Sequence, residues 1–188
     1  MFEENVIERT VAKAPLGERS KRDSVRLQAL GDLYYLASRN KEIRQQPLGR
    51  VRLRLEPAVH HDFFTVFRKD GVPLAALTWA FLNPDAEIKV VNGQPLKTKE
   101  WLSGRRMWLM DVIILNGQGT ASSTIRWFQK QLPQRVQTVR YVRRKLADSS
   151  SRIVEMYRAD QTRWSVQLLN PNWIPQPRAL GPQPKPRT

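Results

Sequence analysis

The chain has no cysteine among its 188 residues. Because disulfides, thiolate zinc sites and cysteine nucleophiles all need a thiol, the sequence excludes all three. It also has no long apolar run: no stretch approaches the ~20 residues that a membrane helix needs, and the charged start MFEENVIERT has no apolar segment of the kind found in secretory signals. We therefore expect a soluble, cytoplasmic protein with no membrane span.

Acidic residues are scarce compared with basic ones. Lys and Arg together number 32 against 17 for Asp and Glu, which gives a formal net charge of +15 at pH 7. Such a surface attracts polyanions, whether nucleic acid, an acidic protein or an anionic cofactor, although a solvated basic surface is equally compatible with the count. The length suits a single domain, and a hydrophobic content of 40% is enough for its core.

The two ends of the chain differ in composition from its middle. Residues 1–22 mix charges and hold few large apolar side chains, so we expect a mobile arm. Residues 161–188 are basic and rich in proline, which disfavours helix and sheet and predicts an extended tail. The folded domain is therefore predicted over residues 23–160.

Apolar periodicity predicts the first elements of this domain. Residues 23–37 have helical spacing, and Pro47 closes that region. Over residues 51–55, apolar side chains alternate with arginines, which predicts a half-buried strand, with a helix as the competing interpretation.

A hairpin is the clearest local prediction. Two β-rich runs, 63–68 and 74–81, flank an Asp70-Gly71 pair, and Asp-Gly between apolar runs is typical of a tight hairpin turn. Residues 87–91 predict a further short strand.

The second half of the domain repeats this alternation of strands and helices. The strongly apolar run 108–115 predicts a central strand, a glycine-rich turn follows, and 120–132 predicts a helix. Residues 136–142 and 152–158 predict two more strands. The sum is an α/β (α+β) fold with a mixed, mostly antiparallel sheet flanked by helices.

Asp111 is the one acid inside the apolar run 108–115. An unpaired, charged carboxylate is costly to bury, so some other group must compensate it. Pairing with an arginine such as Arg52, or with backbone amides, would make the residue structural. A position in a cleft with a shifted pKa would make it functional, and the residues themselves leave both open.

A glycine turn with Gly117, Gly119 and Thr120 joins the central strand to the next helix. Free backbone N–H groups at a helix N-terminus suit a phosphate or pyrophosphate, although a plain strand-to-helix turn also favours glycine. The turn is therefore a candidate for binding an anionic cofactor.

Two other polar clusters each allow more than one interpretation. The sequence His60-His61-Asp62 holds metal-ligand side chains, but neighbours on a strand face opposite ways, so no metal site is predicted. A basic strand end suits a nucleic-acid backbone or an acidic partner, or is a solvated edge strand; it comprises Arg140, Arg143, Arg144 and Lys145.

Several short motifs follow one another along the chain: Leu30-Gly31, Asp70-Gly71-x-Pro73, Thr78-Trp79-Ala80, Trp101-x-Ser103-Gly104 and Trp108-x-x-Asp111. In order and spacing this set resembles the RTX toxin-activating lysine acyltransferases, over roughly residues 25–160. The resemblance implies a fold related to the GNAT acetyltransferases. It also implies acyl transfer from an acyl carrier protein to lysine ε-amines of a protein toxin, in the cytoplasm and often as a homodimer.

The resemblance also assigns the acid/base pair. The family's aspartate matches Asp111, whereas the position of its histidine is occupied by Ile43 and that of a nearby serine by Asn40. Since attack by a lysine amine needs a base to remove the ammonium proton, the adjacent Glu42 is the candidate substitute.

The resemblance makes acyl-acyl carrier protein the donor, with no metal and no permanently bound cofactor. Arg105 and Arg106, together with the glycine turn, would then bind the carrier and its phosphopantetheine arm. The alternative is a non-catalytic module on the same fold, which binds nucleic acid or an acidic protein through its basic surface and in which Ile43 marks lost chemistry.

Overall fold

A single mixed sheet organises the protein. The computed structural model describes residues 19–115, 120–144, 151–160, 163–169 and 173. Within these residues six strands lie in the order β1-β2-β3-β4-β5-β6, and every neighbouring pair is antiparallel except β3 and β4. The predicted α/β class, with a mixed and mostly antiparallel sheet, is confirmed.

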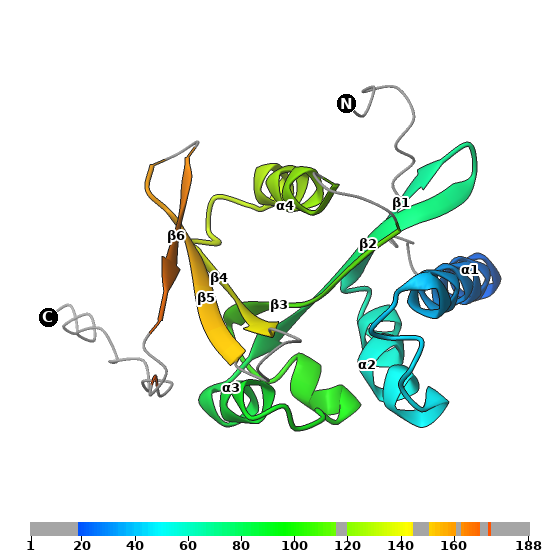
Figure 1. The fold of residues 1–188 in the computed structure, drawn as a ribbon, viewed down its shortest axis with the longest axis horizontal. Helices are drawn as coiled ribbons and strands as arrows, with labels where there is room; N and C mark the ends of the chain where they lie inside the picture. The colour runs from blue at the N-terminus through cyan, green and yellow to red at the C-terminus, as the bar shows by residue number, and fades with distance from the viewer. Residues whose placement is uncertain (1–18, 116–119, 145–150, 161–162, 170–172, 174–188) are drawn as a thin grey trace, which may run out of the picture.

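The elements follow one another in the order shown in Figure 1. The helices are α1 (Arg19–Arg39), α2 (Leu48–His60), α3 (Pro84–Val91), the short 3-10 helix η1 (Thr98–Trp101) and α4 (Thr120–Gln131). The strands are β1 (Phe64–Lys69), β2 (Val72–Leu82), β3 (Arg106–Ile114), β4 (Thr138–Arg144), β5 (Ser151–Arg158) and β6 (Trp164–Leu168).

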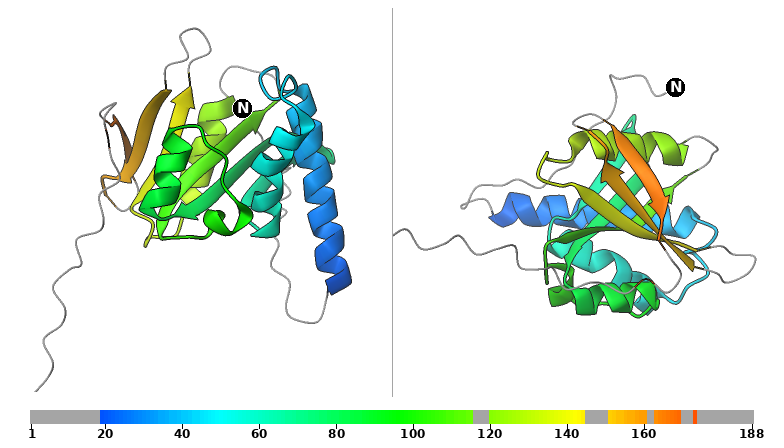
Figure 2. Two further views of the ribbon diagram at one scale, coloured as in Figure 1. Left: turned by 90° about the horizontal axis from the view of Figure 1, so that it is seen from below. Right: turned by 90° about the vertical axis from the view of Figure 1, so that its left-hand side faces the viewer.

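Helices cover both faces of the sheet (Figures 1 and 2). On one face, α1, α2, α3 and η1 contribute Leu33, Leu55, Ala86 and Trp101 to a buried apolar cluster. On the other face, Phe128 of α4 packs in a second cluster against side chains of β2 and β3. The sheet therefore separates two apolar layers. A functional side chain on the sheet points into one of these layers.

The predicted hairpin is confirmed as β1 and β2. Asp70 and Gly71 both have left-handed backbone, with φ of 51° and 77°, as a turn that matches strand twist requires. The strand predicted over 108–115 is β3, and the helix predicted over 120–132 is α4.

The prediction of a strand over 51–55 is wrong and the competing helix is correct, because these residues lie inside α2. Val51, Leu55 and Ala58 are buried at helical spacing, whereas the side chain of Leu53 is 53% exposed. Strand alternation would have put Leu53 on the buried face with its neighbours.

The prediction of a strand over 87–91 is also wrong, since these residues form most of α3. Asn83 caps this helix, its side-chain Oδ1 accepting a hydrogen bond from the N–H of Ala86 at 2.9 Å. Pro84 occupies the first turn together with the acids Asp85 and Glu87, and all three favour a helix start.

Strand β6 adds an element that the sequence did not predict. It pairs with β5 from Arg158↔Trp164 to Val154↔Leu168, so the sheet continues past residue 160 into the segment assigned to the tail. At the other end, α1 begins at Arg19, inside the segment assigned to the arm. No helix among the described residues is long and apolar enough to cross a membrane.

Candidate functional site

Asp111 lies on β3 next to a break in strand register. It pairs with Thr78 across β2, but Trp79 pairs with Leu109, so Met110 is the extra residue of a β-bulge. A bulge turns the side chains that follow it relative to those that precede it. The carboxylate of Asp111 thereby reaches the face covered by α1 and α2, where its side chain is 1% exposed.

The group that compensates this buried carboxylate is Arg54 of α2. Its Nε donates a hydrogen bond to Oδ1 of Asp111 at 2.5 Å, and its Nη2 forms an ion pair with the same oxygen. The hydroxyl of Thr78 donates a weaker hydrogen bond to Oδ2 at 3.4 Å. The structural interpretation of Asp111 is therefore supported, but its expected partner was wrong, because Arg52 pairs with Glu56 instead.

The guanidinium of Arg54 is the electrostatic centre of this group. Burial acts to lower the pKa of Arg54, but attraction to Asp111, the hydrogen bond between them and attraction to Glu42 together raise it above its usual value. Arg54 therefore stays charged, and it lies near both acids that the sequence proposed as the acid/base pair.

The turn between α1 and α2 fixes how residues 42 and 43 point. The side-chain oxygen of Asn40 accepts hydrogen bonds from the backbone N–H groups of Glu42 and Ile43, at 3.0 and 3.1 Å. Glu42 is exposed, whereas Ile43 is 5% exposed and packs in the apolar cluster under α1 and α2. The turn thus presents the glutamate outward and directs the isoleucine into the core.

Strands β3 and β4 are parallel neighbours over only a short length. Their register consists of Met107↔Val139 and Trp108↔Arg140, and beyond these pairs the two strands diverge (Figure 2). In the described residues, the facing backbone edges of 110–114 and 141–144 are therefore not paired with each other. Asp111 lies just past the last paired position.

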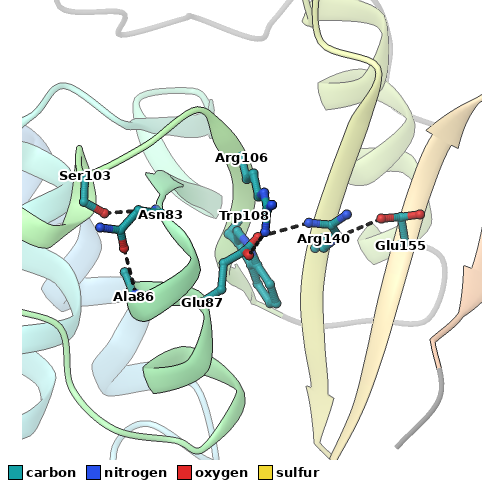
Figure 3. A network of polar contacts seen from close by, with 8 residues as sticks. All are labelled: Asn83, Ala86, Glu87, Ser103, Arg106, Trp108, Arg140 and Glu155. Carbon is teal, nitrogen blue, oxygen red and sulfur yellow. Dashed lines mark hydrogen bonds and ion pairs between the residues drawn. The ribbon is translucent and has the colours of Figure 1, made fainter. Parts of the chain in front are cut away.

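A buried glutamate holds the paired end of these two strands together (Figure 3). Glu87 of α3, fully buried, accepts hydrogen bonds from Trp108 Nε1 at 2.8 Å and Arg106 at 2.5 Å, both on β3. It also pairs with Arg140 of β4 at 3.0 Å, which in turn pairs with Glu155 of β5 at 2.6 Å. No site role was predicted for Glu87, because the residue was placed in a predicted strand.

The other predicted site residues differ in exposure and in their contacts. Arg105 is exposed, whereas Arg106 and Arg140 are held by Glu87. Arg143 is exposed and Arg144 ends β4. Thr120 is the first residue of α4, whereas Gly117, Gly119 and Lys145 lie outside the described residues. A role for any of them in binding a donor or partner stays a prediction.

The histidine pair makes ordinary structural contacts. His61 Nε2 lies 2.8 Å from the carbonyl oxygen of Thr98, and Asp62 pairs with Arg26 at 3.2 Å. No group of three metal-ligand side chains occurs within the part of the chain that the structure describes.

Comparison with known proteins identifies relatives of this chain. Residues 23–158 match the RTX toxin acyltransferase family. The RTX-I toxin-activating lysine-acyltransferase ApxIC of Actinobacillus pleuropneumoniae is 30% identical over 95 residues, covering 50% of this chain and 55% of that protein. The protein-lysine myristoyltransferase RtxC of Kingella kingae is 35% identical over 86 residues, covering 45% and 51%.

A further relative extends the match slightly. The protein-lysine myristoyltransferase HlyC of Escherichia coli is 28% identical over 108 residues, covering 57% of this chain and 61% of that protein. The chain thus spans between half and two thirds of the length of these relatives. Among solved structures, the loading GNATL domain of CurA from Lyngbya majuscula has a TM-score of 0.43 and 17% identity, over 63% of this chain and 61% of that one.

Proposed function

Because the chain belongs to the RTX toxin acyltransferase family, we propose that it transfers an acyl group from an acyl carrier protein to a lysine amine of a protein. The single observation that carries this proposal is the divergence of β3 from β4 beside Asp111. An extended donor can add to an unpaired strand edge through main-chain hydrogen bonds. A phosphopantetheine arm is such a donor, since it is narrow and carries two amide groups.

The reaction breaks the C–S bond of the thioester and forms a C–N bond to the lysine amine. The ammonium must first lose a proton, and the departing thiolate must gain one. We assign the first step to Glu42, because it is an exposed acid whose charge acts on Arg54. After the attack the nitrogen loses a second proton, which the departing thiolate gains, and Glu42 releases the first proton to water.

Arg54 and Asp111 then have different roles from an acid/base pair. The side chain of Arg54 is 34% exposed, so its guanidinium can stabilise the negative charge that develops on the thioester oxygen. Asp111, buried and ion-paired, positions Arg54.

Intact-mass measurement tests the activity. Purified protein is incubated with acyl-acyl carrier protein and a lysine-bearing target, and a mass increase on the target is expected. Glu42→Gln should lower the rate by roughly 100-fold or more, the usual contribution of a general base. The control Asp85→Asn, which removes an exposed acid from α3, should leave the rate unchanged. Absence of transfer from the wild-type protein would refute the proposal.

A second candidate function follows from the burial of Ile43 in the core. With no titratable side chain at that position, the fold would bind a partner without catalysis, using its basic surface. Nonspecific nucleic-acid binding should then weaken by orders of magnitude between about 50 and 200 mM salt. Binding that is absent or insensitive to salt argues against nucleic acid and leaves an acidic protein as the partner of this module.

A further inference from the structure

Trp173 returns the chain to the junction between β3 and β4, shortly after β6 ends at Leu168. The centroid of its ring lies 6.2 Å from the ring of Trp108 on β3 and 4.9 Å from the guanidinium carbon of Arg140 on β4. Trp108 and Arg140 are partners in the strand register, and they form the last pair before the two strands diverge. Trp173 therefore contacts both strands at the position where their pairing ends.

This contact lies on the face of the sheet that also holds the ion pair of Arg54 and Asp111. Trp108 is fully buried in the apolar cluster beneath α1, α2 and α3. Trp173, half-buried, packs against the same cluster. The side chain of Asp111 reaches this face too, where it meets Arg54 of α2. Trp173 is therefore placed where it can influence the proposed reaction, although it contacts none of the residues assigned to the chemistry.

Arg140 is held both at the edge and on the face of its guanidinium group. Its Nε donates a hydrogen bond to Glu155 at 2.6 Å, and its Nη1 donates one to Glu87 at 3.0 Å, so that it lies between two carboxylates (Figure 3). Hydrogen bonds of a guanidinium lie in its plane and leave a flat face that stacks on an aromatic ring. The ring of Trp173 supplies that contact. Arg140 thus links β4 to α3, to β5 and to the chain beyond β6.

We propose that Trp173 is a positioning residue that holds β4 against β3 at their last register pair and so fixes where the unpaired strand edge begins. The inference rests on the proposed function, in which the donor adds to that edge through main-chain hydrogen bonds. Such pairing places a donor accurately only where the register of the edge is itself fixed. Without Trp173, β4 can move relative to β3 and the donor binds more weakly, whereas the charges of Glu42 and Arg54 are unchanged.

Hydrogen–deuterium exchange on the full-length protein tests the contact without any substrate. Loss of a local contact raises the exchange of the amides that it protects. Trp173→Ala should therefore raise the exchange rates of residues 107–108 and 139–140 about tenfold, the factor for a cation–π contact of intermediate strength. Trp173→Phe keeps an aromatic face for Arg140 and should return these rates toward the wild-type values.

The chain offers a matched control for this substitution. Trp164 of β6 makes the same kind of contact, with the guanidinium carbon of Arg158 lying 4.7 Å from the centroid of its ring. It packs against the apolar cluster on the opposite face of the sheet. Trp164→Ala should leave the exchange of 107–108 and 139–140 unchanged. Rates there that Trp173→Ala leaves unaltered, or that Trp164→Ala raises equally, would overturn the inference.

Initial rates of acyl transfer provide the second measurement. With acyl-acyl carrier protein as the donor, Trp173→Ala should raise the KM for the donor about tenfold and leave kcat nearly unchanged, the pattern of lost ground-state binding. Trp173→Phe should restore the KM, and Trp164→Ala should not alter it. If Trp173 were merely structural, Trp173→Ala would lower the thermal midpoint as Trp164→Ala does and leave the donor KM at the wild-type value. That result would overturn the inference.

The two measurements separate this inference from the proposed function. Raised exchange at the junction in Trp173→Ala, together with no transfer by the wild-type protein, would refute the proposed function and leave Trp173 as the residue that holds β3 and β4 together. Transfer by the wild-type protein with a donor KM that Trp173→Ala does not change would refute the inference alone. If Trp173→Ala does not fold, Trp173→Leu takes its place with the same expected changes, since leucine covers Trp108 but offers Arg140 no ring.

Discussion

The ion pair between Arg54 and Asp111 predicts an asymmetric response to mutation. The side chain of Asp111 is 1% exposed and that of Arg54 is 34% exposed. In Arg54→Met the buried carboxylate loses its counter-ion and cannot reach water. In Asp111→Asn the guanidinium can turn toward solvent. Removing the partner of the more buried group should therefore cost more stability than the reverse substitution.

The magnitudes follow from this difference in burial. Breaking a buried pair by removing one partner costs about 3–5 kcal/mol. Arg54→Met should fall near the lower end, about 3 kcal/mol, because the Thr78 hydroxyl still donates to Asp111. Asp111→Asn should cost about 1.5–2 kcal/mol, the lower part of the range for a hydrogen bond to a charged group. The double variant, which leaves no buried charge, should be more stable than Arg54→Met alone.

Urea unfolding followed by circular dichroism measures all three variants, with m required to stay constant. Arg52→Met is the matched control, two residues earlier on α2, where the arginine pairs with Glu56 at the surface. It should leave the urea midpoint nearly unchanged, because exposed ion pairs contribute little. Equal destabilisation by Arg54→Met and Asp111→Asn, or a double variant less stable than both, contradicts the reasoning.

Three further predictions concern single positions. Glu87→Gln should destabilise the protein by about 3 kcal/mol in urea, because a fully buried carboxylate that binds two arginines loses its charge. Gly104→Ala should lower the free energy of unfolding by at least about 2 kcal/mol, since a Cβ there would lie 2.2 Å from a backbone oxygen of β2. Its control, Gly31→Ala on the open surface of α1, should raise the free energy of unfolding by about 0.5–1 kcal/mol. The hydrogen bonds from Lys89 and a backbone amide hold the pKa of Glu100 below its usual value. Its stabilisation is therefore complete above the pKa of an unfolded glutamate, about 4.3, and fades as the pH falls through the folded pKa; Glu100→Gln should be less stable than wild type at neutral pH and equal to it in strong acid.

The hairpin was predictable from the sequence because its turn chemistry is local. Asp70 and Gly71 accept left-handed backbone readily, and no distant contact is needed to place them. The strand prediction over residues 51–55 failed because a window of only five residues fits both the period of a strand and the period of a helix. Extending the window to Ala58 favours a helix, since positions 51, 55 and 58 share one helical face.

The start of α3 was also signalled locally, by Asn83 followed by Pro84. The role of Glu87 was not, because its arginines come from β3 and β4, up to 53 residues away. The same limit applies to Asp111. The position of Asp111 in a buried strand could be predicted. Its partner Arg54 could not, because it is 57 residues distant and only the packing of α2 on the sheet brings the two together.

The turn at Asn40 explains why the neighbouring side chains of Glu42 and Ile43 have opposite environments. Asn40 binds the N–H groups of two consecutive residues, and consecutive residues in a tight turn point in different directions. Ile43 therefore enters the core while Glu42 faces solvent near Arg54. A titratable side chain at position 43 would lose its hydration in that core, and burial disfavours its charged form. The turn thus buries residue 43 and leaves the carboxylate of Glu42 in contact with water and near the charge of Arg54.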